Sequence, residues 1–527
     1  MIPVTQAIGY ACLCWGSIVL LVQGIGTFGI IDGSFKHFSS VPKKAVSPTL
    51  PEDDVPHITI IRPARGLEPY LYECLKSTFL QTYPKGKSTI YFCVSSKDDA
   101  AYSVMRRVID EFPAHDARLF VEDEDPMLNG SEAGIENMGP NPKIRNLSRA
   151  YREVKGDIVW VADCNVWLSS SAAGHMVDRL CGLAPNGQRT KPCKLVHQLP
   201  IVVDTVSSLP RNSTETQALL SGASTPDDSQ EVDTSIMAQG GGRLDEMYMS
   251  TTHAKFYSAI NTVGIAPCVV GKSTMFRKSQ LDEATDPARN PILAASASRL
   301  PNGLDYFSHF ICEDHLIGDL LWRTNFPGFR NHGLNWGDLV VQPAAGMSVA
   351  AYTGRRVRWL RARKWTVLLA TLVEPGVESL LCCFYISITL TTVPWFHQHL
   401  GIGQTWGTLL KAWGIGVTSW MLLDRMVSNR LHAGYSIDID ENTPAFAKGA
   451  KRGGAERRPF GQWLLAWLGR ELLALPIWTW AVLLGTTVSW RGQNFRVGSD
   501  MSVVSIDAGH QSPTPSPPSG RVPNKID

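Results

Sequence analysis

The stretch GDIVWVADCNVW, residues 156–167, decides the fold class of this chain. Its segment Asp157–Ala162 is short, apolar and rich in β-branched residues, as in a strand buried on both faces. Similar segments recur upstream and downstream, with helix-period segments between them. The predicted strands are His57–Arg62, Thr89–Val94, Arg118–Val121, Asp157–Ala162 and Leu195–Val203, and the predicted helices are Leu71–Gln81, Ala100–Phe112, Ile144–Val154 and Ala172–Leu183. This alternation predicts an α/β domain over residues 57–340 with a mostly parallel sheet.

Apolar segments on both sides of this domain predict transmembrane helices. The segment Ala7–Ile31 has no charged residue and is long enough to span a bilayer, so we predict an N-terminal anchor within residues 1–35. Lysines 36, 43 and 44 follow it, and the positive-inside rule then places the α/β domain in the cytosol. About three more spans are predicted in the membrane region 365–490, whose basic loop 424–460 would be cytosolic. They are Trp365–Phe396, Ile402–Leu423 and Leu473–Trp490.

The composition of the remaining segments predicts disorder, and the composition of the whole chain limits the classes of partner. Residues 207–242 and 500–527 contain few large apolar side chains, so we predict a disordered insertion and a disordered tail. The chain has 50 basic and 48 acidic residues, which argues against a nucleic-acid partner. Its 11 cysteines form no CxxC pair, so the soluble part is expected in a reducing compartment.

Three acidic clusters are expected at the edge of the sheet where ligands bind, beyond the carboxyl ends of the strands. They are SSKDD with Asp99, VADCN with Asp163 and CEDH with Asp314. A nucleotide-sugar transferase needs one carboxylate for the nucleoside, one for a divalent metal on the diphosphate, and one as base. Any single aspartate is more often a strand-end or helix N-cap residue than a functional one, so the joint placement is what favours this chemistry.

The motif RRVRW lies in an interfacial segment, residues 345–364, before the predicted membrane region. One interpretation is a basic run attracted to anionic lipid. In the other, Arg355 and Arg358 bind a diphosphate through their planar guanidinium groups, and Trp359 lines an acceptor pocket at the membrane surface.

Glu374 and Glu378 stand one helical turn apart on a predicted membrane helix, so they would share a face. Because ionisable groups at bilayer depth are usually functional, we predict that they shape the binding site of the acceptor headgroup. The alternative is an ordinary interfacial position near Trp365.

The order of the motifs SSKDD, NPKIRNL, VADCN, LVHQLP, PCVVGKSTMFRK, CEDH and RRVRW resembles the ceramide glucosyltransferase family, the glucosylceramide synthases. The resemblance extends from about His57 to Trp490. It implies an inverting GT-A-like nucleotide-sugar-binding domain that transfers glucose from UDP-glucose to the primary hydroxyl of ceramide. It also implies an integral multi-pass protein of the Golgi or endoplasmic reticulum membrane, with the catalytic domain facing the cytosol.

The resemblance also implies roles for single residues. Asp99 would lie against the nucleotide, Asp163 would bind magnesium or manganese, and Asp314 would be the catalytic base. Further substrate-binding positions would be Lys143, His197, Cys268, Arg355, Arg358, Trp359, Glu374 and Glu378. Lys143 is equally well explained as a solvated lysine at a helix start, and a lone His or Cys on a β-segment is more often packed in a core. The sequence Asp-Cys-Asn departs from the Asp-x-Asp of many such enzymes, which leaves Asn165 as a weak helper at most.

Other functions stay open at this point. A processive polysaccharide synthase or a dolichol-phosphate glucosyltransferase uses similar motifs, although processive enzymes usually have Gln at the position of Arg355 and more membrane helices. A degenerate transferase acting as a lipid-binding scaffold would be expected to lose one of Asp163, Asp314 or Arg355, and all are present. The expected partners are therefore UDP-glucose, ceramide and the lipid bilayer. The choice between glucose and galactose and the oligomeric state are left open.

Overall fold

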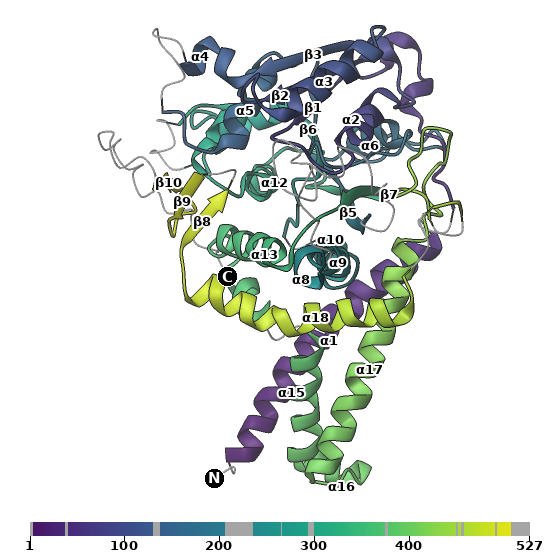
Figure 1. Cartoon of the computed structure of the whole chain (residues 1–527), viewed down its shortest axis with the longest axis vertical. Coiled ribbons are helices and arrows are strands. Elements are labelled where there is room, and N and C mark those ends of the chain that lie inside the picture. Colours follow the sequence, from purple (N-terminus) through teal and green to yellow (C-terminus); the bar gives the residue numbers. More distant parts are fainter. Residues whose placement is uncertain are drawn as a thin grey trace.

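The computed structural model describes residues 4–36, 40–129, 137–205, 235–264, 266–293, 300–374, 378–449, 452–454, 458–490 and 493–506. A globular part built around one large sheet stands above a stalk of helices (Figure 1). Short helical turns connect the larger elements: Ser47–Thr49, Glu52–Asp54, Lys85–Lys87, Glu122–Glu124, α4 Pro126–Asn129 and Gly303–His309.

The central sheet has seven strands in the order β3-β2-β1-β4-β6-β5-β7. The strands are β1 Ile58–Pro63, β2 Ser88–Val94, β3 Asp116–Val121, β4 Ile158–Ala162, β5 Leu195–Asp204, β6 Ser273–Arg277 and β7 Gly333–Ala344. Only β6 runs antiparallel to its neighbours, so the prediction of a mostly parallel sheet is confirmed. Every residue of β1 and β2 is buried, as expected of strands covered on both faces.

The predicted helices of the α/β domain are present with slightly shifted ends. They are α2 Leu71–Phe79, α3 Ala100–Glu111, α5 Pro142–Arg152 and α6 Ala172–Cys181. N-capping side chains explain where two of these helices start. The Asp99 side chain accepts a hydrogen bond from the Ala101 amide at the start of α3, and Asn141 caps α5, whose first residue is Pro142.

Several elements were not predicted, and part of the predicted disordered insertion is helical. The additional helices are α8 Ile236–Gln239, α9 Gly241–Tyr248, the π-helical turn Met249–His253, α10 Ala254–Val263, α11 Lys278–Thr285 and α12 Glu313–Arg323. The prediction for residues 207–242 is therefore wrong from Ser235 onward, because Ser235 caps α8 and α9 packs tightly on the domain. A Cβ atom on Gly241 would lie 2.0 Å from the Ser348 carbonyl oxygen. Residues 207–234 lie outside the described residues.

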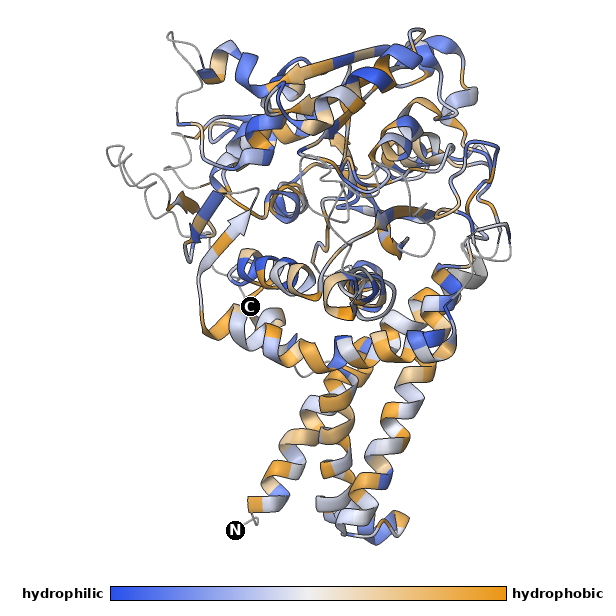
Figure 2. Ribbon diagram, viewed as in Figure 1, coloured by the Kyte–Doolittle hydropathy of each residue, from blue (hydrophilic) through white to orange (hydrophobic). Residues whose placement is uncertain are grey.

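The stalk consists of α1 Val4–Lys36, α15 Ser379–Thr392 and α17 Trp406–Leu431, which pack side by side, with α16 Pro394–Leu400 at the far end (Figure 1). Figure 2 shows that apolar residues predominate on these helices. In the described part of the chain, one helical segment, Val4–Ile31, is long and apolar enough to cross a membrane, with a mean hydropathy of 1.8. A second span results only if α15 and α16, bent by 68°, count as one. The predicted number of C-terminal spans is not confirmed.

The predicted membrane span Leu473–Trp490 is wrong. Its first part belongs to α18 Phe460–Trp478, which lies across the base of the globular part (Figure 1) and continues as the π-helical turn Thr479–Leu483. The rest forms β8 Thr487–Trp490, which pairs with β9 Gln493–Val497, and β9 pairs with β10 Val503–Ser505. The alternation of buried Val488 with exposed Ser489 is a strand pattern that a hydropathy average conceals.

Two neighbouring predictions also need correction. The predicted tail begins too early, because residues 500–506 complete this second sheet; residues 507–527 lie outside the described residues. The segment Trp365–Phe396 is not one helix, since α14 Leu368–Val373 is separate from α15 and accepts a hydrogen bond from Trp478 of α18 at the Thr371 carbonyl oxygen. The interfacial segment that precedes it is largely one helix, α13 Val349–Arg363, whose N-cap is Ser348.

Candidate active site

The antiparallel pairing of β4 with β6 places a lysine opposite the second predicted aspartate. Ala162 pairs with Ser273, so Asp163 and Lys272 face each other just beyond the paired residues. The Asp163 amide donates to the Lys272 carbonyl oxygen at 3.1 Å. The Lys272 Nζ lies 3.0 Å from Asp163 Oδ2 and 3.0 Å from Asn165 Oδ1. Asp163 therefore has a cationic partner that the sequence analysis missed.

Lys143 brings a second ammonium group to Asp163. Asn141 caps α5 by accepting from the amides of Lys143 and Ile144, and the Lys143 side chain then extends inward with 9% of its surface exposed. Its Nζ lies 3.1 Å from Asp163 Oδ1 and 3.2 Å from Glu313 Oε1. The solvated alternative for Lys143 is thus excluded, and the Asp163 carboxylate lies between two lysines.

Asp314 joins this cluster from the first turn of α12. Its Oδ2 accepts a hydrogen bond from the Gly271 amide at 2.6 Å. A Cβ atom on Gly271 would lie 3.1 Å from that oxygen and 3.2 Å from Lys143 Nζ, so a residue without a side chain lets the loop approach closely. The motifs NPKIRNL, VADCN and CEDH, which are far apart in the sequence, therefore meet at one place.

Electrostatics fixes the charge states of the cluster. Burial acts to lower the pKa of Lys143, but the carboxylates of Asp163, Glu313 and Asp314 outweigh it and raise that pKa. Burial acts to raise the pKa of Asp163, but Lys143 and Lys272 outweigh it and lower that pKa. Both groups are therefore charged at neutral pH, while burial and the charge of Asp314 raise the pKa of Glu313.

The predicted divalent metal at Asp163 does not fit the arrangement of donors described here. Both carboxylate oxygens of Asp163 and the amide oxygen of Asn165 already accept from ammonium groups. In the described part of the chain, no group of three or more His, Cys, Asp or Glu side chains is placed to hold a metal ion. A hard divalent cation needs several such oxygen ligands, and the oxygens around Asp163 are already bound to ammonium groups.

Asp99 lies at the carboxyl end of β2, but its contacts are structural. Its Oδ1 caps α3 and also accepts from the Gly66 amide at 2.8 Å. Gly66 has φ +68°, a conformation that favours glycine, in the loop that follows β1. Asp99 thus fixes a loop at the ligand-binding edge of the sheet, and its contact with a nucleotide stays a prediction.

The RRVRW motif forms part of α13, and Arg355 is held in place by two other elements. Its guanidinium lies 3.5 Å from Asp245 Oδ2 on α9 and donates to Gln342 Oε1 on β7 at 3.3 Å. It also stacks over the Trp359 ring, with 4.7 Å to the ring centroid. Arg358 lies one turn along the same helix and is half-buried. These contacts orient Arg355, and a contact with diphosphate stays a prediction.

His197 is fully buried in a ring cluster. Its Nδ1 forms a hydrogen bond with the Tyr257 hydroxyl, and its ring stacks on His332 at 5.5 Å between centroids. Burial, with a contribution from the His332 charge, lowers the pKa of His197 well below its ordinary value, so the ring is neutral. No contact in the described part of the chain joins His197 to Asp163 or Asp314, and the core interpretation fits it better than substrate binding.

Cys268 lies closer to the cluster. Burial raises the pKa of its thiol to about 12, with Asp314 adding to the increase and Arg363 opposing it. The thiol is therefore protonated at neutral pH. Its position three residues before Gly271, the partner of Asp314, keeps a role near the substrate as a prediction.

Glu374 and Glu378 do not share a face of one helix, and that prediction is wrong. Helix α14 ends at Val373, and Glu378 is the N-cap residue of α15. Pro375 stands between them in the sequence, and proline lacks the N–H that a continuous helix needs.

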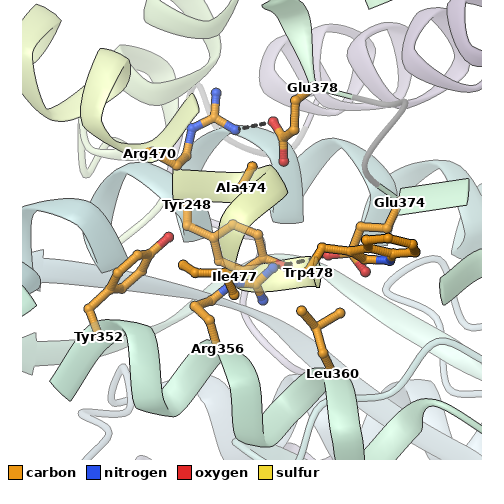
Figure 3. A pocket seen from close by; sticks show the side chains of 10 residues that line it. All are labelled: Tyr248, Tyr352, Arg356, Leu360, Glu374, Glu378, Arg470, Ala474, Ile477 and Trp478. Atoms are coloured by element: carbon orange, nitrogen blue, oxygen red, sulfur yellow. Dashed lines mark hydrogen bonds and ion pairs between the residues drawn. The ribbon is translucent and has the colours of Figure 1, made fainter. Parts of the chain in front are cut away.

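Both glutamates nevertheless line one pocket (Figure 3). Its lining residues are Tyr248, Tyr352, Arg356, Leu360, Glu374, Glu378, Arg470, Ala474, Ile477 and Trp478. Arg356 donates to Glu374 at 3.0 Å, and Arg470 donates to Glu378 at 2.6 Å. The cavity of about 20 Å³ has room for one water and not for a lipid chain. Its charges are paired with one another, so contact of these glutamates with an acceptor headgroup stays a prediction.

The comparisons with known proteins agree with these motifs. The family model described as Glycosyl transferase family 21 matches residues 27–207 and 299–503. A ceramide glucosyltransferase of Pyricularia oryzae is 54% identical over 511 residues, covering 96% of this chain and 97% of the relative. One of Gibberella zeae is 50% identical over 508 residues, covering 95% and 94%.

Similarity to solved structures is weaker. The mannosyltransferase PcManGT from Pyrobaculum calidifontis, in complex with GDP-Man and Mn²⁺, is 14% identical with a TM-score of 0.39, covering 80% of this chain and 96% of that chain. The family match extends over more than half of the chain and contains the motifs that meet around Asp163. This chain therefore belongs to glycosyl transferase family 21.

Proposed function

We propose that this protein is a ceramide glucosyltransferase that transfers glucose from UDP-glucose to the primary hydroxyl of ceramide. The observation that carries the proposal is the meeting of Lys143, Asp163 and Asp314 at one edge of the sheet. The chain is also similar, over 96% of its length, to a protein named ceramide glucosyltransferase. The donor, the stereochemistry and the residue roles that follow belong to this proposal.

Asp314 is assigned as the base. Its Oδ2 is oriented by the Gly271 amide, which holds the carboxylate at the start of α12. The ceramide hydroxyl transfers its proton to this carboxylate while its oxygen attacks the anomeric carbon from the face opposite UDP. The bond from carbon to the diphosphate oxygen breaks in the same step, so an α-linked donor gives β-glucosylceramide and UDP.

The departing diphosphate needs fixed positive charge. Lys143 supplies it from a buried position that stays protonated at neutral pH, because three carboxylates raise its pKa. Arg355 and Arg358 are assigned to the same task, since a guanidinium group matches phosphate oxygens and Arg355 is already oriented by Asp245 and Gln342.

A lipid acceptor requires the site to lie at a membrane, and α18 supports that arrangement. Its charged residues Arg470 and Glu471 point inward and are buried, while Leu465, Leu472 and Leu475 are exposed. In water the opposite arrangement is expected, whereas a bilayer accepts exposed leucines. We place α18 in the membrane interface.

The stalk is placed within the bilayer, and the globular part in the cytosol. The apolar segment Val4–Ile31 and the lysines that follow it support this orientation. A multi-pass topology and a Golgi or endoplasmic reticulum membrane complete the proposal.

The test uses membranes from cells that lack their own activity, supplied with UDP-glucose and a fluorescent ceramide. We expect Asp314→Asn to lower the rate of glucosylceramide formation by about 10²–10⁴-fold, the usual contribution of a positioned base. The matched control is Asp319→Asn on the same helix, where Asp319 pairs with Arg323 near the surface; its rate should change by less than about twofold.

Two outcomes would contradict the proposal. Asp314→Asn at the wild-type rate would remove the assignment of the base. Release of UDP by the wild type without any glucosylated ceramide would remove the assignment of the acceptor.

A further inference from the structure

We propose that Lys272 is a positioning residue that supplies positive charge to Asp163 in place of a divalent ion. The transferase therefore works without a bound divalent metal. The inference rests on the proposed function and concerns the same site. It begins from the observation that a second ammonium group lies on the one carboxylate predicted to bind metal.

Lys272 is held by its backbone, which distinguishes it from a mobile surface lysine that meets an acid by chance. Its amide donates to the Val270 carbonyl oxygen at 2.7 Å, and its own carbonyl oxygen accepts from the Asp163 amide at 3.1 Å. The next residue, Ser273, starts β6 and is fully buried, accepting from Trp160 Nε1 at 2.8 Å. The lysine is 7% exposed, so its side chain extends into the site from a rigid strand start.

The charges match those of a metal site. A divalent ion would bring two positive charges to Asp163, and the ammonium groups of Lys143 and Lys272 together bring two. The difference is that here the positive charge is covalently part of the chain.

The available donors also favour the lysines. Lys272 Nζ lies 3.0 Å from both Asp163 Oδ2 and Asn165 Oδ1, which are the two oxygens that an Asp-x-Asn sequence would offer to a cation. A divalent ion at this place would have to displace Lys272 and would then stand beside the ammonium group of Lys143. Like charges at such distances repel strongly in a buried site.

The test compares wild type with two substitutions, in the purified full-length protein in detergent. Lys272→Met removes the charge at similar size, and Lys272→Arg keeps it. Two quantities are measured: the rate of glucosylceramide formation with and without EDTA, and the binding of Mn²⁺ in the presence of UDP, followed by electron paramagnetic resonance.

We expect the wild type and Lys272→Arg to keep their rates in EDTA and to leave Mn²⁺ free. Lys272→Met should lose on the order of 10²-fold in rate in EDTA, the usual effect of removing one group that stabilises developing charge. Mn²⁺ should restore its rate and become bound. A residue with a merely structural role would not change the binding of Mn²⁺.

Wild-type protein that binds Mn²⁺ together with UDP and loses its activity in EDTA would overturn the inference. A folded Lys272→Met protein that stays active in EDTA and binds no Mn²⁺ would overturn it as well. If Lys272→Met does not fold, the measurements on the wild type and Lys272→Arg still decide whether the transferase works without a bound metal. Absence of glucosylceramide under every condition would instead contradict the proposed function, which separates the two failures.

Discussion

Cys268 illustrates how burial, with a smaller contribution from neighbouring charges, determines the reactivity of one side chain. Its thiol pKa is raised to about 12, and the thiolate is the reactive form. The thiolate fraction therefore rises about tenfold for each pH unit up to that pKa. An ordinary thiol has a pKa near 8.5, so at pH 7.5 we expect N-ethylmaleimide to modify Cys268 on the order of 10²–10³-fold more slowly than glutathione.

Mass spectrometry of the modified peptide measures this rate at several pH values, with glutathione in the same tube as the reference. Modification of Cys268 at the rate of glutathione, without dependence on pH above 9, would contradict the burial described here.

At the residue scale, the sequence predicts the aspartates better than their partners. Asp163 and Asp314 stand out because each lies within a short acidic motif that follows a predicted strand or begins a helix. Lys272 lies in the motif PCVVGKSTMFRK but was assigned no role, because its importance depends on which residue it faces across an antiparallel strand pair. The pairing of β4 with β6 is a long-range contact that no local pattern in GKS reveals. The role of Asp245 was not predicted for the same reason: it orients Arg355 from α9, which begins where the predicted insertion ends.

At the element scale, a buried charge network joins the stalk to the globular part. Arg470 on α18 contacts Glu378, Glu471 and Asp424, and Lys255 on α10 lies 2.6 Å from Asp424. Arg470→Met would leave three buried carboxylates with one cation. We expect the free energy of unfolding in detergent to fall by about 3–5 kcal/mol.

The control for this prediction is Arg107→Met on α3. The Arg107 side chain pairs with Glu111 and is 69% exposed, so the same substitution should change the free energy of unfolding by less than about 1 kcal/mol. Equal effects of the two substitutions would show that the network does not stabilise the fold.

The small C-terminal sheet supports the loop that precedes the proposed base. Phe310 forms a β-bridge with Ser502, and Ile311 packs in one cluster with Val503 and with Ala362 of α13. A chain that ends at Ile506 should keep its rate of glucosylceramide formation within about twofold. A chain that ends at Gly498 loses β10, and a small displacement of Asp314 should lower that rate by about 10²-fold.

Initial rates of the two shortened proteins, compared at equal amounts of folded protein, check this prediction. Equal rates would mean that β10 does not position Asp314. Hydropathy alone could not predict this sheet, because TTVSW follows an apolar helix and its alternating burial appears only once β9 pairs with it.

At the scale of the whole molecule, the sequence predicts the α/β domain with five of the seven strands of its sheet, as well as an apolar N-terminal helix. It predicts neither β6 and β7 nor how the C-terminal third is folded. The last part of α18, from Leu473, was assigned to a membrane span because exposed leucines raise the average hydropathy of a helix whose charges point inward. A membrane span and a helix in the membrane interface can have the same average hydropathy. Only the inward direction of the Arg470 and Glu471 side chains distinguishes the two.

The placement of α18 in the interface can be tested by photo-crosslinking. Benzoylphenylalanine at position 472, where the native Leu472 is 64% exposed, should form adducts with lipid in native membranes. The same group at position 107, on the side of α3, should form none. Absence of lipid adducts at position 472, with adducts at the position of Leu20 in α1, would contradict the proposed interface.

The central claim is that this chain joins glucose to ceramide at the cluster of Lys143, Asp163 and Asp314, and purified protein in liposomes tests it most directly. With ceramide as the sole acceptor and UDP-glucose outside, we predict β-glucosylceramide in a one-to-one ratio with released UDP. The product should be lost in Asp314→Asn and kept in Asp319→Asn. Release of UDP without a glycolipid, or an α-linked product, would contradict the account.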